Sequence, residues 1–238
     1  MPNIPTTPPF LAEARADAGL LRYKRLRQWV DDALTLIFPP RCAGCGRVDA
    51  VWCERCQREI DRVPFVQKAD PFDSLTAWAA TGVHEAILQN AVQALKYERA
   101  LAAAEPLGQR LAHCAADLAW TFDLIIPVPL HEERLRSRGY NQAELMASVM
   151  GRILHVPCRP HAIRRVRNTR SQVGLDQAQR LENVADAFVA HEEGLRGLQV
   201  LLVDDVFTTG ATMDACARAA QAAGAKAVYA LTVTTARA

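Results

Sequence analysis

The 238-residue chain has no long apolar run and no recognisable export signal. Its apolar stretches all fall short of the roughly 18 residues that a membrane-spanning helix needs. Residues 1–10 are rich in proline and polar side chains and lack the apolar segment of a signal peptide. The seven cysteines are an odd number, which argues against a disulfide framework and suits a reducing compartment. These absences predict a cytoplasmic protein, and the formal charge of +2 indicates no class of partner by itself.

A Walker-type phosphate loop is also absent, because the chain has no Gly-x4-Gly-Lys-Ser/Thr spacing. A different arrangement occurs at residues 200–212, where an apolar run ends in Asp204 and Asp205. A short hydroxyl-rich turn follows, and a helical pattern then extends to Gly224. The turn consists of Thr208, Thr209, Gly210, Ala211 and Thr212. A second apolar run at residues 227–233 completes a strand–loop–helix–strand order, which predicts a parallel α/β unit.

The turn between this strand and helix suits a phosphate group. The first backbone N–H groups of a helix are unpaired, and the helix dipole favours negative charge there. Gly210 allows close backbone approach, and the threonines add hydroxyl donors. The carboxylates of Asp204 and Asp205 lie at the carboxyl end of the strand, where they can accept hydrogen bonds from a ribose diol. The stretch predicts a site for a ribose 5-phosphate; the alternative is a buried strand whose acids only cap the helix.

Four of the seven cysteines form two Cys-x2-Cys pairs, Cys42 with Cys45 and Cys53 with Cys56. Four thiolates are the ligand set of a closed tetrahedral zinc site, so we predict structural zinc with a role in folding rather than catalysis. An iron–sulfur cluster and a redox pair are the alternatives. The remaining cysteines have no partner at such a spacing and are predicted to be small apolar residues. They are Cys114, Cys158 and Cys216.

The remaining regular structure is predicted from apolar spacing. Residues 1–18 are predicted to be a flexible tail and residues 20–38 an amphipathic helix with a basic first half. Such a helix can lie on a membrane surface or bind a partner, but packing on its own domain is the favoured interpretation. Residues 63–72 contain two prolines and are predicted to be a linker or an edge strand. Further helices are predicted over 83–97, 106–118 and 141–154, and strands over 75–81, 123–129 and 187–190.

An arginine-rich segment directly follows the predicted strand 123–129. It begins at Leu130 and His131 and includes Arg134, Arg136 and Arg138. Arginine binds phosphate oxygens in a fork, so a position at a strand end predicts that this segment binds an anion such as pyrophosphate. A solvated basic loop is the alternative. Of the six histidines, only His131 is expected near the site, and no nucleophile or general base can be named.

A second basic segment spans residues 159–180 and holds six arginines against one acid. They are Arg159, Arg164, Arg165, Arg167, Arg170 and Arg180. A long polar connection of this kind predicts a mobile loop that closes over a pyrophosphate. The same arginines could contact the backbone of single-stranded nucleic acid, although the segment lacks aromatic residues for base stacking.

Together these blocks resemble the ComF family over about residues 34–235. Residues 203–212 resemble the motif with which type I phosphoribosyltransferases bind 5-phosphoribosyl 1-pyrophosphate (PRPP). The other blocks are the cysteine pairs with Phe38 before them, Leu95-Lys96-Tyr97, Pro127–Leu130 with residues 138–142, and residues 167–188. The resemblance implies an α/β fold with a type I phosphoribosyltransferase-like parallel sheet flanked by helices. It implies three parts: a tail and helix at 1–38, the zinc module at 39–62 and the transferase-like domain at 63–238.

The resemblance also implies roles for particular residues. Asp204 and Asp205 would bind the ribose hydroxyls and stabilise a ribosyl cation, and residues 208–212 would bind the 5′-phosphate. Leu130, His131 and Arg138 would bind the pyrophosphate, and residues 167–180 would form the flexible loop. Mg²⁺ would enter with PRPP, held largely by its phosphate oxygens.

Three functional hypotheses follow from the residues and the resemblance. The first is a phosphoribosyltransferase with an unknown acceptor. The second is a PRPP-sensing adaptor without turnover. The third is a factor that binds single-stranded DNA and works with a competence helicase or another protein of an uptake machine. The ComF resemblance implies a role in DNA uptake during natural transformation or in the use of DNA as a nutrient, in the cytoplasm or at the inner face of the membrane.

Overall fold

The computed structural model describes residues 39–48, 50–68, 72–167, 187–190 and 194–236. The predicted tail and helix of residues 1–38 lie outside these ranges, and so do residues 168–180 of the predicted flexible loop, which include Arg170. Within them, no helix is both long enough and apolar enough to cross a membrane.

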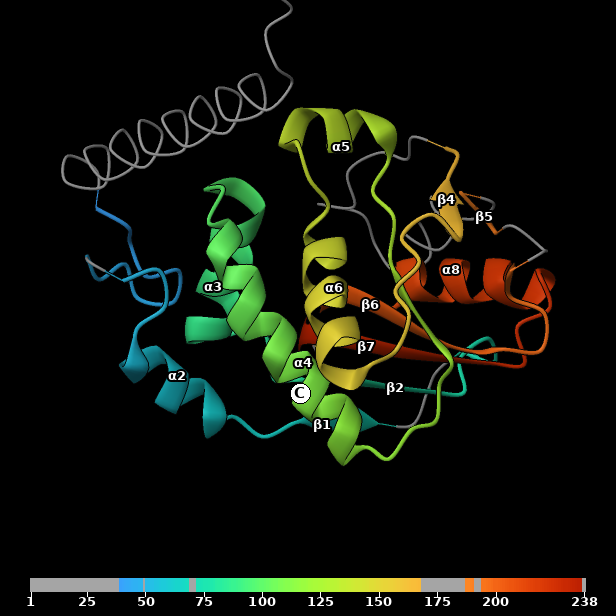
Figure 1. Ribbon diagram of the computed structural model, residues 1–238, viewed down its shortest axis with the longest axis horizontal. Helices are drawn as coiled ribbons and strands as arrows, with labels where there is room; N and C mark the ends of the chain where they lie inside the picture. The colour runs from blue at the N-terminus through green and yellow to red at the C-terminus, as the bar shows by residue number, and fades with distance from the viewer. Residues whose placement is uncertain (1–38, 49, 69–71, 168–186, 191–193, 237–238) are drawn as a thin grey trace, which may run out of the picture.

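A five-stranded sheet with the order β1-β2-β7-β6-β3 lies at the centre of the described residues (Figure 1). Strand β1 pairs antiparallel with β2, and the other neighbours in the sheet pair in parallel. The strands are β1 (Val66–Lys68), β2 (Ala77–Ala80), β3 (Leu124–Pro127), β6 (Gln199–Phe207) and β7 (Ala227–Thr235). The sheet confirms the predicted α/β class, and β1 confirms the edge-strand interpretation of residues 63–72.

Helix α8 (Ala211–Ala222) connects the two long central strands, β6 and β7. It begins after Gly210, whose φ of +83° is the left-handed conformation that glycine adopts without strain. A β-carbon at this position would approach Phe72 to 2.3 Å and Phe207 to 2.7 Å. Glycine is therefore required here both for the backbone conformation and for space.

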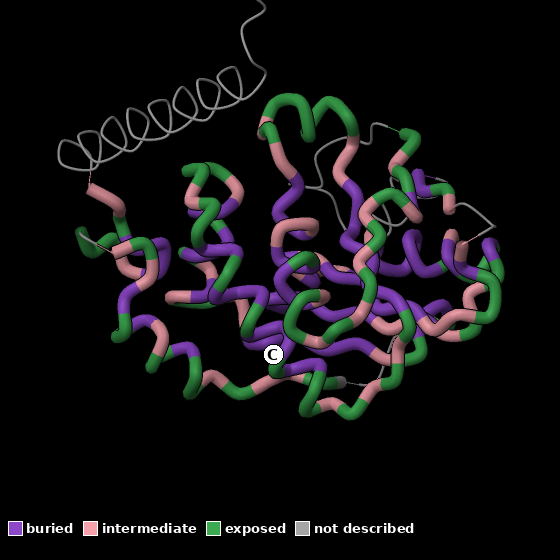
Figure 2. The backbone as a smooth tube through the Cα atoms, viewed as in Figure 1, coloured by how far each residue is buried: buried purple, intermediate pink, exposed green. Residues whose placement is uncertain are grey.

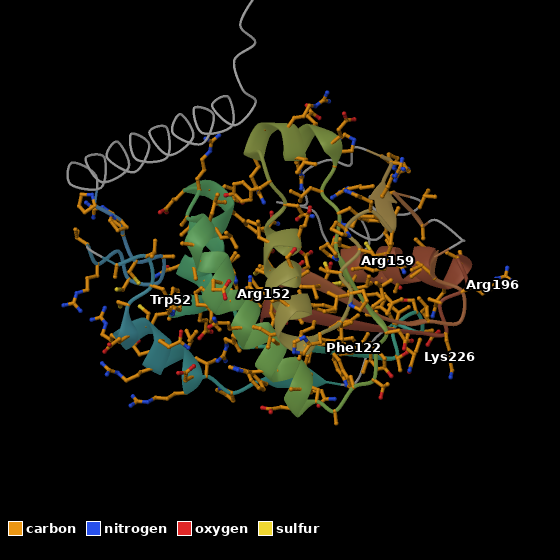
Figure 3. The ribbon with its side chains drawn as sticks, in the orientation of Figure 1. Trp52, Phe122, Arg152, Arg159, Arg196 and Lys226 are labelled. Carbon is orange, nitrogen blue, oxygen red and sulfur yellow. The ribbon has the colours of Figure 1, made fainter. Side chains whose placement is uncertain are left out.

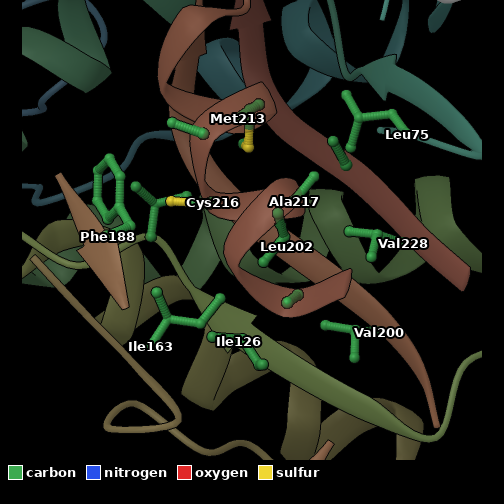
Figure 4. Close-up of a cluster of buried hydrophobic side chains, with 14 of the residues drawn as sticks. Leu75, Ile126, Ile163, Phe188, Val200, Leu202, Met213, Cys216, Ala217 and Val228 are labelled. Carbon is green, nitrogen blue, oxygen red and sulfur yellow. The ribbon is translucent and has the colours of Figure 1, made fainter. Parts of the chain in front are cut away.

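The two faces of the sheet carry separate hydrophobic clusters. One cluster packs α8 and a short antiparallel pair, β4 (Ile163–Arg165) and β5 (Phe188–Ala190), against residues such as Ile126 and Leu202 (Figure 4). The other packs three helices against residues such as Leu201 and Val203. Alternation along β6 thus buries both faces, and Figure 2 shows the buried backbone concentrated at the centre of the molecule.

The three helices on the second face are α3 (Ala86–Tyr97), α4 (Ala104–Asp117) and α6 (Gln142–Leu154), and a short turn η1 (Leu101–Ala103) precedes α4. Each confirms a helix that apolar spacing predicts. Helices α4 and α6 pack closely, and Arg152 of α6 bonds both carboxylate oxygens of Glu105 on α4 at 2.7 and 2.8 Å (Figure 3). Asn141 caps α6 by accepting a hydrogen bond from the Ala143 amide.

Three elements were not predicted as regular structure. Residues 132–138 form helix α5 (Glu132–Arg138), capped by His131 at its start and by Gly139, with φ of +85°, at its end. Acids in its first turn and arginines in its last are the charge pattern that stabilises a helix, and the same arginines also fit a phosphate-binding loop. Arg164 and Arg165 lie in β4 rather than in a connecting loop. Helix α2 (Glu54–Asp61) begins directly after Cys53.

The cysteine region packs against the sheet domain through α2 and α3. The Asn90 side chain on α3 donates to the Gly44 carbonyl at 2.9 Å. Arg110 of α4 is buried, and its guanidinium donates to the carbonyls of Ile60, Val63 and Thr81. These bonds join the end of α2 to the end of β2, so the four-cysteine region is part of the same packed structure.

Candidate functional site

The acid pair and the Leu130–His131 segment meet at one edge of the sheet. Strands β3 and β6 run in parallel with Pro127 opposite Val203, and the Val128 amide donates to the Val203 carbonyl at 2.8 Å. Leu130 and His131 follow β3 there, and Asp204 and Asp205 lie just beyond the same point of β6. The structure therefore brings together two of the segments that the sequence analysis assigned to one ligand.

Asp205 is held by charged and polar groups from two helices. Its carboxylate lies 2.6 Å from Lys96 Nζ at the end of α3, and it accepts a hydrogen bond of 2.6 Å from Gln142 at the start of α6. The side chain is almost fully buried. Burial lowers the pKa of Lys96, but the attraction of the Asp205 carboxylate outweighs it and the net pKa is raised. The ion pair with Lys96 and the hydrogen bond from Gln142 therefore hold the Asp205 side chain in a fixed position.

Lys96 and Gln142 belong to a larger network that the sequence analysis did not assign. Arg138 donates to the Gln142 side chain, and its guanidinium lies over the Tyr97 ring, 5.7 Å from the centroid. The Tyr140 hydroxyl donates to the Leu95 carbonyl. These residues belong to two blocks of the family resemblance, Leu95-Lys96-Tyr97 and residues 138–142. Nothing in the sequence spacing of the two blocks indicates that they contact each other.

Asp204 faces the opposite side of the sheet from Asp205, because successive residues of a strand alternate. Burial and the Asp205 charge raise the pKa of Asp204 to about 7, against the lowering influence of Lys96, the Asp205 amide and Arg165. The Asp205 amide donates to the Asp204 carboxylate at 2.8 Å. The two acids were predicted to share one role, but the structure distinguishes an anchored Asp205 from an Asp204 whose pKa is raised to about 7.

The turn that follows β6 leads directly into α8. Thr208, Thr209 and Thr212 are partly exposed, whereas Gly210 and Ala211 are buried. The Thr209 hydroxyl oxygen is 3.5 Å from the Ala211 amide, and the first intrahelical bond runs from the Asp214 amide to the Gly210 carbonyl. The turn thus leads directly into a helix N-terminus, a place where the helix dipole favours an anion.

Two arginines from different elements approach the same edge. Burial and the positive charge of Arg134 on α5 lower the pKa of Arg165 in β4, whereas the Cys216 and Asp204 side chains raise it. The mutual repulsion of two nearby guanidinium groups is relieved when an anion lies between them. Arg164 and Arg167 are exposed on the same short strand and its extension. Figure 1 shows α5 lying between α3 and the β4–β5 pair.

His84 is a second histidine near the acid pair, so the expectation that only His131 lies there is wrong. Its Nδ1 is 2.7 Å from the Thr234 hydroxyl, which in turn donates to the Asp205 carbonyl at 3.3 Å. Burial and the Lys96 charge lower the pKa of His84, and Asp205 opposes them. His131 instead caps α5, accepting a hydrogen bond from the Glu133 amide. Parallel strand pairing brings His84 close, and no local pattern predicts it.

The four paired cysteines form one cluster. The sulfurs of Cys42, Cys45, Cys53 and Cys56 all lie within 4.8 Å of one another. The Cys42–Cys56 and Cys45–Cys53 sulfur pairs are 3.6 and 3.7 Å apart, far beyond the roughly 2.05 Å of a disulfide. Four thiolates around a tetrahedral ion with bonds of about 2.3 Å would be about 3.8 Å apart. A hydrogen bond from the Arg47 amide lowers the pKa of Cys45 to about 6, which favours a thiolate. The donor set and spacing fit a metal ion.

A hollow of about 330 Å³ lies elsewhere, between α2, β1 and the start of α3. Its lining includes Ile60, Val66 and Leu88, and none of the predicted site residues. The hollow is therefore separate from the predicted site at the carboxyl edge of the sheet.

Comparison with curated proteins identifies relatives along most of the chain. The DNA utilization protein YhgH of Escherichia coli O157:H7 is 30% identical over 182 residues, which cover 72% of this chain and 78% of that protein. The chain belongs to the ComF family. Competence protein F of Haemophilus influenzae is 29% identical over 182 residues, covering 74% of this chain and 76% of that protein. The ComF relative of Bacillus subtilis, competence protein ComFC, is 34% identical over 95 residues, or 40% of this chain and 37% of that protein. No family model matches the chain.

Solved structures similar to this ComF protein include phosphoribosyltransferases. Glutamine PRPP amidotransferase of Bacillus subtilis, in complex with ADP and GMP, has a TM-score of 0.39 at 21% identity, covering 56% of this chain and 26% of that chain. Orotate phosphoribosyltransferase of Mycobacterium tuberculosis has a TM-score of 0.32 at 19% identity, covering 76% and 85%. Likenesses of this degree support no inference about ligand or activity, and the fold described above rests on strand order and register.

Proposed function

We propose that this ComF protein binds PRPP at the carboxyl edge of the sheet. The observation that carries the proposal is the joint placement of Asp204 and Asp205 between a glycine-initiated helix and the Leu130–His131 segment. A ribose with phosphate groups at both ends needs hydrogen-bond acceptors in the middle and donors or cations on either side. This edge offers that order of groups.

The ribose hydroxyls donate to the carboxylate of Asp204, whose partner Asp205 is held in place by Lys96 and Gln142. The 5′-phosphate accepts from the amides and hydroxyls of residues 208–212 at the start of α8. The pyrophosphate accepts from the amides of Leu130 and His131 and from the guanidinium groups of Arg134 and Arg165. Arg138 already bonds Gln142, so it supports the anchor as well as the charge of the edge. The phosphate oxygens of PRPP would carry a Mg²⁺ ion, which would neutralise part of their charge.

Transfer of the phosphoribosyl group is the chemistry that this arrangement suits. The bond from C1 to the pyrophosphate oxygen breaks, and pyrophosphate leaves with the bonding electrons. The lone pair of an acceptor nitrogen or oxygen forms the new bond to C1, and the acceptor's proton passes to a base or to solvent. Asp204 stabilises the positive charge that develops on the ribose, and its pKa of about 7 lies in the range of a general base at neutral pH. PRPP binding without turnover is the second candidate function.

The names of two relatives, a competence protein and a DNA utilization protein, connect such a domain with DNA. We place this protein in the same setting, as an accessory factor of DNA uptake or utilisation. Exposed Arg164 and Arg167 next to the site could contact a phosphate backbone. A helicase or another protein of the uptake machinery is the partner that this setting suggests.

We also propose that the four-cysteine cluster binds a structural Zn²⁺. Cys42, Cys45, Cys53 and Cys56 would hold the ion in a closed tetrahedral site, where it fixes the first residues of the described chain against α2. A closed site has no open coordination position, so the ion contributes to folding and takes no part in chemistry.

Isothermal titration of the full chain with PRPP, in the presence and absence of Mg²⁺, tests the binding proposal. The Asp204→Asn variant should lose about tenfold or more in PRPP affinity, because the amide keeps the shape of the side chain but loses its charge. Asp123→Asn is the matched control, since Asp123 accepts from the Gln199 amide at the opposite end of β6. Equal PRPP affinity in all three proteins would overturn the assignment.

A further inference from the structure

Tyr97 is the most exposed large apolar or aromatic side chain among the described residues, with 75% of its surface accessible. A single exposed aromatic residue is ordinary by itself. This one differs because it ends α3 directly beside the acid pair: its neighbour Lys96 forms the ion pair with Asp205. Arg138 lies over the Tyr97 ring and bonds Gln142, which bonds Asp205, so the ring borders the network that holds Asp205.

The backbone and ring of Tyr97 are fixed from three directions. The Leu95 carbonyl accepts a hydrogen bond from Tyr140, Lys96 is bound to Asp205, and Arg138 lies over the Tyr97 ring. Arg138 is itself held by Gln142, which bonds the other oxygen of Asp205. A closed network thus holds an aromatic ring that stays largely open to solvent. Holding a ring in this way lowers the entropic cost of a later contact.

We propose that Tyr97 and Arg138 form a stacking platform for an unpaired nucleobase that carries a phosphate group. A base stacks on a tyrosine ring whatever its identity. Arg138 lies over the Tyr97 ring, where it adds a cation–π contribution, and the exposed part of the ring is open to the base. Arg134 and Arg138 on α5 supply positive charge for the attached phosphate. The arginine-rich segment of residues 159–180 has no aromatic residue; the ring comes from α3, far away in the sequence.

The proposal goes beyond PRPP binding and does not depend on it. A free nucleotide and a single strand offer the same base and phosphate, so the platform serves either an acceptor nucleotide or a strand passing the edge of the sheet. A duplex hides the faces of its bases in the stack and is excluded.

Fluorescence anisotropy with a labelled single-stranded oligodeoxynucleotide of ~15 nucleotides tests the platform on the full chain without PRPP. The comparison strand has the same length and phosphates but abasic sugars throughout. The base-bearing strand should bind about fivefold or more tightly than the abasic strand. Tyr97→Ala should remove this difference by weakening only the base-bearing strand, and Tyr97→Phe should keep it.

Leu101→Ala is the matched control, because Leu101 is also an exposed apolar residue just beyond α3 and should leave both affinities unchanged. A titration with AMP distinguishes the two sources: Tyr97-dependent binding of AMP indicates a nucleotide, and Tyr97-dependent binding of the strand alone indicates a strand. Equal binding of base-bearing and abasic strands by the wild type would overturn the proposal. So would a difference that survives in Tyr97→Ala.

Discussion

At the scale of single residues, the two adjacent acids have separate roles. Asp205 is buried, paired with Lys96 and bonded by Gln142, whereas Asp204 faces the other side of the sheet with a pKa raised to about 7. A carboxyl group whose ionisation is opposed by its surroundings destabilises the folded state at neutral pH. Such opposition is common where a protein prepares a charge for a ligand.

Asp204→Asn should therefore stabilise the protein at pH 8 while weakening PRPP binding. The folded pKa lies above the ordinary value of 3.8, so between pH 4 and 7 the folded state keeps a proton that the unfolded chain has lost. The unfolding free energy contributed by Asp204 falls across this window and is lowest above pH 7. We expect a gain of about 1–3 kcal/mol at pH 8 and little change at pH 4, measured by urea unfolding at both pH values.

The exposed Asp117 at the end of α4 provides the control for this measurement, since Asp117→Asn should change stability by less than about 0.5 kcal/mol at either pH. A pH-independent effect of Asp204→Asn would contradict the account of its charge.

At the scale of elements, the last turn of α3 connects the helical face of the sheet to the carboxyl edge. Three consecutive residues contact three different groups: Leu95 accepts from Tyr140, Lys96 pairs with Asp205, and Tyr97 lies under Arg138. Of the three partners, Arg138 lies on α5, Tyr140 in the connection from α5 to α6, and Asp205 in β6. The position of Asp205 therefore depends on three helices as well as on its strand.

Lys96→Met should destabilise the protein by about 3 kcal/mol or more, because it leaves the Asp205 carboxylate buried without its cation. The double variant Lys96→Met with Asp205→Asn should be more stable than Lys96→Met alone, since an amide has no charge to compensate. Lys226→Met is the control, because Lys226 is an exposed lysine (Figure 3). This substitution should change the unfolding free energy by no more than about 0.5 kcal/mol. If the double variant is less stable than Lys96→Met, an uncompensated Asp205 charge is not the reason why Lys96→Met loses stability. Urea unfolding at pH 7 measures the unfolding free energy of the wild type, Lys96→Met, the double variant and Lys226→Met.

At the scale of the whole molecule, the four-cysteine region and the sheet domain form one packed unit. Arg110 joins the end of α2 to β2, and Asn90 joins α3 to the first cysteine turn. Loss of order at the cysteine cluster should therefore also destabilise the sheet domain.

The purified protein should contain one zinc ion per chain, and Cys53→Ser should lose it together with several kcal/mol of stability in a single unfolding transition. Elemental analysis and thermal unfolding monitored by circular dichroism check both parts. Cys158 lies outside the cluster, so Cys158→Ser should keep full zinc content. Iron in place of zinc, or loss of metal without loss of sheet stability, would contradict this prediction.

Local patterns were sufficient to predict the strand–turn–helix around Gly210, the main helices and the cysteine cluster, because apolar period, glycine and ligand spacing are encoded within a few residues. They were not sufficient for the anchors of Asp205. Lys96 and Gln142 are 46 residues apart in the numbering and meet only because α3 and α6 cover the same face of the sheet. His84 reaches the site in the same way, through pairing of β2 with β7. Helix α5 was missed although its caps were present in the sequence.

A crystal structure of the full chain with PRPP and Mg²⁺ tests the central claim most directly. The account predicts the 5′-phosphate against the amides of residues 208–212, the ribose hydroxyls on Asp204 and the pyrophosphate between the Leu130–His131 segment and Arg134. It also predicts that the Lys96–Asp205 pair stays intact in the complex. PRPP bound away from the carboxyl edge of the sheet, or bound there with its phosphates far from residues 208–212, would contradict it.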